Sequence, residues 1–137
     1  MIAVLQLCVG RRCLVYQIIH GSRLINEALQ GFLGNPDFLF VGFGIDGDAQ
    51  KLLHDYGLWV ANTADLNRVA AELGQPERRQ LGMKAVAREM MGVEIEKPER
   101  VRRSRWDAPD LTQEQIAYAT MDAYVSYEVG RLLLSGQ

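Results

Sequence analysis

The chain has 137 residues and a mass of 15.4 kDa, enough for one domain with a hydrophobic core. Its net charge of −2 and isoelectric point near 5.7 argue against a protein that coats nucleic acid non-specifically, but an acidic nuclease site beside a local basic patch stays compatible with them. The longest apolar run, Met1 to Val9, is interrupted by Gln6 and is too short to span a bilayer.

The first residues also lack the basic start and cleavage pattern of a secretory signal. We therefore expect a soluble intracellular protein, in the nucleus or the cytoplasm, with no membrane partner. Cys8 and Cys13 are then expected to be reduced thiols that flank one turn.

In chain order, the pattern first predicts a β-hairpin and a helix. Ile2 to Val9 is apolar almost throughout, Gly10-Arg11-Arg12 supplies a turn, and Cys13 to Ile19 is rich in β-forming residues. Apolar residues at helical spacing then predict a helix from Leu24 to Leu33, which Gly34 can close. The sequence thus opens inside a strand, with no polar residues before it.

The middle of the chain alternates strands and helices. Phe38 to Phe43 is a continuous apolar run, typical of a strand that is covered on both faces. A helix from about Asp46 to Tyr56 and a short strand from Leu58 to Ala61 are expected to follow. Thr63-Ala64-Asp65 can cap a further helix that runs to Leu73.

The last part is predicted to be helical apart from one loop. A helix from Leu81 to Met91 ends at Gly92, and the charged, proline-containing segment from Val93 to Asp110 is expected to be an extended loop. Thr112 caps a final helix that reaches Leu134. The order of elements predicts one α/β domain over residues 1–137, a mixed sheet with helices packed on its faces.

Two residues of the final helix are the first candidates for chemistry. Tyr118 and Asp122 are four residues apart, so both project from the same side of the helix. Asp122 sits among small and apolar residues, where it either bonds to a neighbouring backbone group or arginine, or binds a metal beside a tyrosine that orients water.

Asp48 is the second candidate, because ligand sites in open α/β sheets gather where strands end. Asp46 and Asp48 also suit the start of a helix, where negative charge is favoured without any function. Residues 42–47, Gly-Phe-Gly-Ile-Asp-Gly, match a dinucleotide-binding loop as well. Against that alternative, the two acids would crowd a pyrophosphate, and Asp65, near the distance of a ribose-binding acid, fits better as a helix-start residue.

These segments resemble the Werner-syndrome-type DEDDy 3′–5′ exonucleases, particularly the plant ones, over essentially the whole chain. Residues 42–52 are similar to the second exonuclease motif of that family, and residues 116–122, with Tyr118-x-x-x-Asp122, are similar to the third. The landmarks between the motifs also occur in the family's order: Asp55-Tyr56-Gly57, Gly82-Met83-Lys84, Ser104-Arg105-Trp106-Asp107 and Leu111-Thr112-x-Glu114-Gln115.

The resemblance implies a ribonuclease H-like α/β fold and metal-dependent hydrolysis at DNA or RNA 3′ ends. It assigns Asp48 and Asp122 as metal ligands and Tyr118 as the residue that positions the nucleophile. The family's first motif, an Asp-x-Glu on an earlier strand, is missing, and no Asp-x-Glu occurs anywhere in the chain. We therefore expect weak binding of Mg²⁺ or Mn²⁺, one ion or none, in a domain that is truncated at its N-terminal strand.

Basic residues before Trp106 suggest a nucleic-acid contact. The segment from Lys97 to Arg105 has five positive residues against one negative. It is either a solvated loop or a phosphate-binding surface that includes Arg102, Arg103 and Arg105, with Trp106 free to stack on a base. Lys84 on its helix is a further candidate for a phosphate contact.

Two functions remain open at this point. One is a 3′–5′ exonuclease, which the missing motif would leave weak or inactive. The other is a pseudoenzyme that keeps the fold and binds nucleic acid or a protein. The missing strand would leave the strands Ile2 to Val9 and Phe38 to Phe43 with unpaired backbone groups, so we also expect a homodimer or a protein partner that lends a strand.

Overall fold

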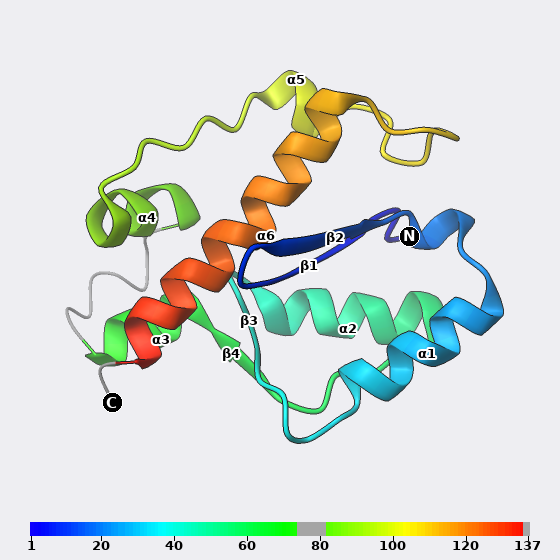
Figure 1. The fold of residues 1–137 in the computed structure, drawn as a ribbon, viewed down its shortest axis with the longest axis horizontal. Helices are drawn as coiled ribbons and strands as arrows, with labels where there is room; N and C mark the ends of the chain where they lie inside the picture. Colours follow the sequence, from blue (N-terminus) through cyan, green and yellow to red (C-terminus); the bar gives the residue numbers. More distant parts are fainter. Residues whose placement is uncertain (74–81, 136–137) are drawn as a thin grey trace.

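A computed structural model describes residues 1–73 and 82–135 of the chain (Figure 1). The elements, in chain order, are β1 (Leu5–Val9), β2 (Arg12–Tyr16), the 3-10 turn η1 (Ile18–His20), α1 (Arg23–Leu33), β3 (Phe40–Gly42), α2 (Ile45–Tyr56), β4 (Thr63–Asp65), α3 (Leu66–Leu73), α4 (Met83–Met91), α5 (Glu99–Arg102) and α6 (Gln113–Leu134).

The strands of the described residues form two sheets of two strands each. β1 pairs antiparallel with β2, with Val9 opposite Arg12 beside the turn. β3 pairs parallel with β4, with Phe40 opposite Thr63. The expected α/β fold with helices packed on its strands is therefore confirmed. In the described residues no ladder joins β1 to β3, so the strands are divided between two sheets.

Helix α6 connects the two sheets. It packs against β1, β2 and β3, and it runs obliquely past both sheets in Figure 1. Gly130 permits the close approach to β3, because a Cβ at this position would lie 2.8 Å from Cγ2 of Val41. The branched valine side chain has little freedom to move away. Since α3, α4 and α5 also contact α6, this helix supports most of the domain.

The apolar interior consists of two clusters. One lies where α6 meets α3, α4 and β3, and its buried members are Leu66, Ala70, Val86, Ala87, Ile95, Val125, Val129 and Leu133. The other joins α1 and α2 beneath the hairpin through Ile18, Leu33, Leu52 and Leu58. Among the helices of residues 1–73 and 82–135, none has the length and apolarity that crossing a membrane requires.

The predicted strand from Leu58 to Ala61 is wrong, because a side chain satisfies the backbone there. The Gln30 amide accepts a hydrogen bond from Trp59 N at 3.0 Å and donates one to Trp59 O at 3.1 Å. The strand begins later, at Thr63, within the segment that was predicted to cap a helix. Asp65 nevertheless caps the start of α3, since its Oδ1 accepts a hydrogen bond from Asn67 N at 3.0 Å.

Other predicted boundaries shift by a few residues. The strand predicted over residues 38–43 is limited to β3, and Phe38 and Leu39 are exposed. The helix predicted from Leu81 begins at Met83, and Leu81 itself lies outside the described residues. The segment from 93 to 110 is not fully extended, because α5 forms within it directly after Pro98.

Cys8 and Cys13 face each other across the hairpin as free, half-buried thiols. Burial, then the hydrogen bond and the charge of Cys13, then the charge of Glu128, raise the pKa of Cys8 to about 12. Only the thiolate reacts with alkylating reagents, so we expect Cys8 to react more slowly at neutral pH than a thiol with the ordinary pKa of 9.0.

Iodoacetamide labelling followed by peptide mass spectrometry measures this rate for Cys8. The rate should rise with pH through the alkaline range, because the thiolate fraction grows as the pH approaches the raised pKa. Unfolding in urea should abolish the protection. Rapid labelling of Cys8 in the folded protein at neutral pH would contradict the assignment.

Candidate active site

Asp122 lies in the middle of α6, and a lysine from the segment before α5 pairs with it. Lys97 Nζ is 3.2 Å from Asp122 Oδ1, and the two side chains are 31% and 19% exposed. In the described residues Oδ1 is buried and receives no hydrogen bond besides this ion pair. Burial raises the pKa of the Asp122 carboxyl, and the Lys97 charge opposes that shift. Asp122 is thus an ionisable group held away from water.

Tyr118 lies one helical turn before Asp122 and belongs to the same group of side chains. Lys97 Nζ is 5.7 Å from the centre of its ring, a cation–π contact. Burial raises the pKa of Tyr118, and the charge of Lys97 opposes the shift. The expectation that Tyr118 and Asp122 share a face of the helix is consistent with their common contact to one ammonium group.

Trp106 also contacts the Tyr118 ring. The two ring centres are 5.8 Å apart, and Trp106 Nε1 donates a hydrogen bond to Arg102 O at 3.0 Å. Trp106 is half-buried in this position. A base could stack only on the part of the ring that stays exposed, so Trp106 is less free than the sequence suggested.

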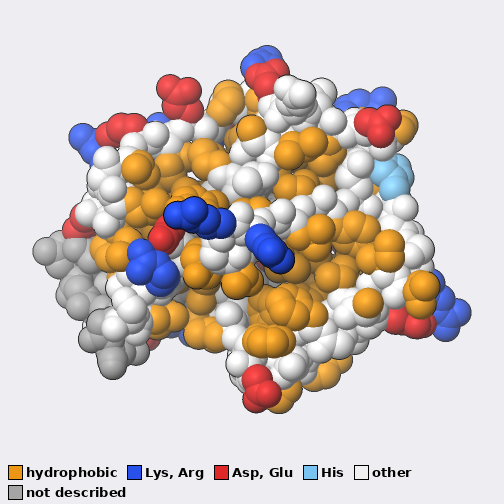
Figure 2. All heavy atoms as spheres, in the orientation of Figure 1, with side chains coloured by type: hydrophobic (Ala, Val, Ile, Leu, Met, Phe, Trp, Pro, Cys, Tyr) orange, Lys and Arg blue, Asp and Glu red, His pale blue; other side chains and the backbone are white. Residues whose placement is uncertain are grey.

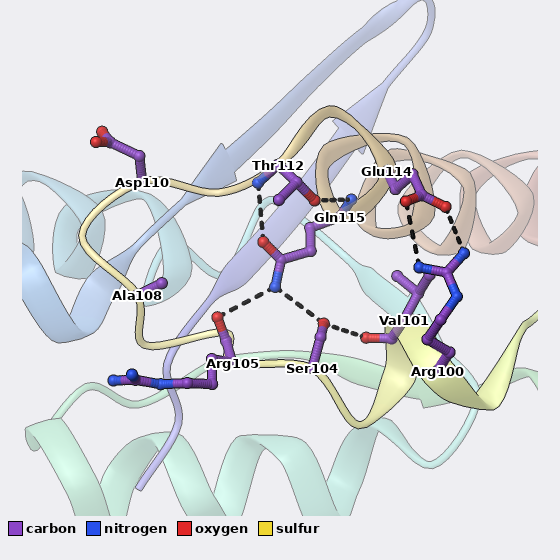
Figure 3. A pocket seen from close by; sticks show the side chains of 9 residues that line it. All are labelled: Arg100, Val101, Ser104, Arg105, Ala108, Asp110, Thr112, Glu114 and Gln115. Carbon is purple, nitrogen blue, oxygen red and sulfur yellow. Dashed lines mark hydrogen bonds and ion pairs between the residues drawn. The ribbon is translucent and has the colours of Figure 1, made fainter.

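Gln115 fixes the loop that carries Trp106, as Figure 3 shows. Its buried amide donates hydrogen bonds to Ser104 Oγ at 2.9 Å and Arg105 O at 3.1 Å. The same amide accepts a hydrogen bond from Thr112 N, and Thr112 Oγ1 accepts one from Gln115 N, which completes a capping box at the start of α6. The pocket in Figure 3 is lined by this network, and the network holds the loop against α6.

A second set of contacts holds the same loop from the hairpin side. Gln17 Nε2 donates a hydrogen bond to Ala108 O at 2.6 Å, and His20 Nε2 lies 2.7 Å from Asp107 O. No role was predicted for His20 or Gln17, whereas Gln115 belongs to one of the family landmarks. The Thr112-x-x-Gln115 spacing, which is typical of a capping box, could also have indicated Gln115.

The arginines of the basic segment each pair with an acid. Arg102 and Arg103 both contact Glu99, at 2.8 and 3.0 Å, and Arg105 lies 3.6 Å from Asp107. These side chains remain more than half exposed. Exposed pairs contribute at most about 1 kcal/mol, so a phosphate can replace the acid as partner. Lys84 is exposed on α4 and has no hydrogen bond or ion pair within residues 1–73 and 82–135.

The two acids that follow β3 differ in their surroundings. Asp46 accepts hydrogen bonds from Thr63 Oγ1 at 2.6 Å and Arg68 at 2.8 Å, so it ties α2 to β4 and α3. Asp48 makes no such bond in the described residues and lies at the first turn of α2. Desolvation raises the pKa of Asp48, the Lys51 charge opposes the shift, and the Asp65 charge adds to it. Asp48 is therefore the uncommitted acid of the two.

The described residues do not assemble a metal-binding cluster of three or more His, Cys, Asp or Glu side chains. Asp122 is grouped with Lys97 and Tyr118, and within residues 1–73 and 82–135 no hydrogen bond or ion pair links Asp48 to them. The glycine-rich segment does not form a free phosphate loop either, because Gly44 N donates its hydrogen bond to Asp65 Oδ2 at 3.2 Å. This bond and the one from Asn67 also occupy the acid that a ribose would need.

Solved structures establish the class of fold. Ribonuclease D from Escherichia coli, described as an exoribonuclease involved in structured RNA processing, superposes with a TM-score of 0.83 at 22% identity over 97% of this chain and 34% of its own. Ribonuclease D from Trypanosoma brucei superposes with a TM-score of 0.82 at 16% identity, over 96% of this chain and 50% of its own. The expected ribonuclease H-like fold is therefore confirmed.

The sequence belongs to the 3′–5′ exonuclease family, whose profile matches residues 1–135. A 3′–5′ exonuclease of Arabidopsis thaliana is 32% identical over 96% of this chain and 45% of its own length. The mouse exonuclease 3′-5′ domain-containing protein 2 is 36% identical over 80% of this chain and 17% of its own length. The mouse bifunctional 3′-5′ exonuclease/ATP-dependent helicase WRN is 33% identical over 90% of this chain and 9% of its own length. The chain spans less than half the length of these relatives. Because the chain belongs to the exonuclease family, the alternative of a dinucleotide-binding domain is wrong.

Proposed function

We propose that this chain binds the 3′ ends of DNA or RNA at the face of α6 that carries Tyr118 and Asp122, and that it hydrolyses them weakly or not at all. The observation that carries this proposal is the partner of Asp122. Within the described residues, this half-buried acid faces a lysine ammonium at 3.2 Å and not a cluster of carboxylates. Membership of the exonuclease family supports the binding of nucleic-acid ends, and the small number of acidic residues at this site supports weak or absent hydrolysis.

The residues present fit part of a metal site. Oδ1 of Asp122 is a hard oxygen that lacks a hydrogen bond, as a ligand for Mg²⁺ or Mn²⁺ would, and Asp48 is a second uncommitted carboxylate. A divalent cation would supply charge stabilisation and water activation if it were bound there. Two carboxylates do not provide the shared ligands of a two-metal site, so we propose one weakly bound ion or none.

Fluorescence anisotropy with single-stranded oligonucleotides in EDTA tests binding apart from hydrolysis. We expect an oligonucleotide with a free 3′ end to bind more tightly than one whose 3′ end is buried in a hairpin. Equal affinity for both would remove the end-binding part of the proposal. The absence of binding to either would reject the nucleic-acid function and leave the protein-binding alternative.

The arginines beside Trp106 should carry much of the affinity. Changing Arg102, Arg103 and Arg105 together to Gln should weaken binding to all sequences alike, because phosphate contacts do not read bases. With about 0.7 counterions released per contact on single strands, the slope of log affinity against log salt should flatten by about two.

Arg11, Arg12 and Arg23 provide the charge-matched control. They lie on the hairpin turn, at the start of β2 and at the start of α1, and changing all three to Gln alters the net charge by the same amount. Anisotropy titrations across a salt series should show a small effect for the control. An unchanged affinity in the Arg102, Arg103 and Arg105 variant would place the binding surface elsewhere.

A second candidate function is a protein-binding module that accepts a strand. The open edges of β1 and β3 favour it, since neither edge has a strand partner within the described residues. Figure 2 shows apolar side chains spread widely over one face of the molecule. The exposed large apolar residues of the hairpin and α6 include Val9, Leu14, Ile116 and Tyr124. Ile116 and Tyr124 line one hollow on α6, and exposed apolar residues that gather in one place are typical of interaction sites.

A further inference from the structure

We propose that Lys97 is the built-in counter-ion of Asp122, so that a divalent cation can bind Asp122 only when the lysine side chain leaves. This inference concerns the site of the proposed function and rests on it. It assigns a role to a residue that has so far been counted only as part of the basic segment.

The position of Lys97 distinguishes it from the neighbouring basic residues. Among the ion pairs of the described residues, the Lys97–Asp122 pair is the one in which both side chains are less than a third exposed. The arginine pairs at Glu99, Asp107 and Glu114 are all largely exposed. Charge interactions are stronger where water is excluded, so Lys97 has the larger effect on its partner.

Two groups on one face of α6 hold the ammonium. Asp122 Oδ1 attracts it at 3.2 Å, and the Tyr118 ring lies 5.7 Å from Nζ. The segment that carries Lys97 is anchored on one side by buried Ile95 and on the other by buried Val101. The lysine is therefore directed onto the two residues that the family motif assigns to the active site.

A metal ion and this ammonium compete for one oxygen. Mg²⁺ binds carboxylate oxygens at about 2.1 Å, and Mn²⁺ accepts similar oxygen ligands, so a bound dication would stand within a few ångströms of Nζ. The two positive charges would repel each other in a half-buried site. Without either cation, Oδ1 would be a buried, ionised oxygen with no partner, which is costly. Lys97 satisfies the carboxylate when no metal is bound.

A purely structural lysine would give a different pattern of results. If Lys97 only fastened the segment 93–98 to α6, its loss would weaken folding and would leave the metal affinity of Asp122 unchanged. If Lys97 is the counter-ion, its loss should strengthen metal binding, and the metal should then stabilise the variant.

Mn²⁺ binding followed by electron paramagnetic resonance, with thermal unfolding as a second readout, tests the proposal in the full chain. Lys97→Met should bind Mn²⁺ about tenfold or more tightly than the unchanged protein, and Lys97→Arg should bind as weakly as the unchanged protein. Adding Asp122→Asn to Lys97→Met should remove the gain. Mn²⁺ should raise the unfolding temperature of Lys97→Met more than that of the unchanged chain.

Arg23→Met is the matched control, because Arg23 lies on the surface of α1 and its loss changes the net charge equally. Equal Mn²⁺ affinity in Lys97→Met and Arg23→Met would overturn the proposal. If Lys97→Met fails to fold, refolding on addition of Asp122→Asn supports the counter-ion role, and failure of the double variant overturns it. Nucleic-acid binding in EDTA is a separate measurement, so the proposed function can fail independently.

Discussion

In Mg²⁺ or Mn²⁺, the purified chain should digest single-stranded or recessed 3′ ends about a thousandfold or more slowly than an exonuclease with a complete acid set. Two-metal hydrolysis depends on carboxylates that hold both ions against the scissile phosphate. This sequence lacks Asp-x-Glu, and its half-buried Asp122 already faces Lys97. Losing several kcal/mol of transition-state stabilisation corresponds to a factor of about a thousand or more in rate.

Gel analysis of 5′-labelled oligonucleotides over long incubations measures this residual rate. Asp122→Ala is the informative control, because a trace activity that survives the substitution would come from a contaminating nuclease. Rapid, metal-dependent digestion that disappears in Asp122→Ala would show that the acids of this chain suffice, and the proposed weak or absent hydrolysis would be rejected.

The features that could be predicted from the sequence depend on local patterns. The Gly10-Arg11 turn sets the hairpin register, and the Thr112 cap sets the start of α6. Family resemblance identified the motif residues, and helical spacing placed Tyr118 and Asp122 on one side. Each of these inferences uses residues that are near each other in the sequence, where geometry follows directly from the backbone.

The remaining features depend on contacts between distant residues. Gln30, 29 positions away in the sequence, forms hydrogen bonds with the backbone N–H and C=O of Trp59. Because of that contact the predicted strand at this position does not form, and the observed strand begins later. The helix-start pattern treats Asp46 and Asp48 alike, and only the contacts with Thr63 and Arg68 show that Asp46 is a structural acid. These side-chain partners are chosen by the folded arrangement, so no local pattern could have indicated them.

Lys97 and the neighbouring arginines illustrate the same limit for charge. In the sequence they form one basic segment, and composition predicts that the whole segment is either a solvated loop or a phosphate-binding surface. In the structure the arginines pair with Glu99, Asp107 or Glu114 at the surface, whereas Lys97 turns towards Asp122 and Tyr118. A count of charges cannot separate these roles, because burial determines how strongly each charge acts.

The chain is also expected to associate through the open edge of β1. The sheet register gives the reason. In a hairpin with a two-residue turn, Val9 and Arg12 exchange hydrogen bonds, and so do Leu7 and Leu14, because bonded and non-bonded pairs alternate. The backbone groups of Gln6 therefore point away from β2. In the described residues β1 does not pair with β3, so the two strands do not close into one sheet and the outer edge of β1 stays open.

Light scattering across a concentration series should show a mass that rises above that of the monomer as strands pair between chains. Gln6→Pro should abolish the association, since proline removes an outward donor and leaves the β1–β2 bonds intact. Val15 is the matched position on the opposite edge, facing Gln6 in the register, so Val15→Pro should leave association unchanged. A folded chain that stays monomeric at every concentration would rule out strand exchange between copies. Equal loss of association in both variants would show that copies meet on another surface.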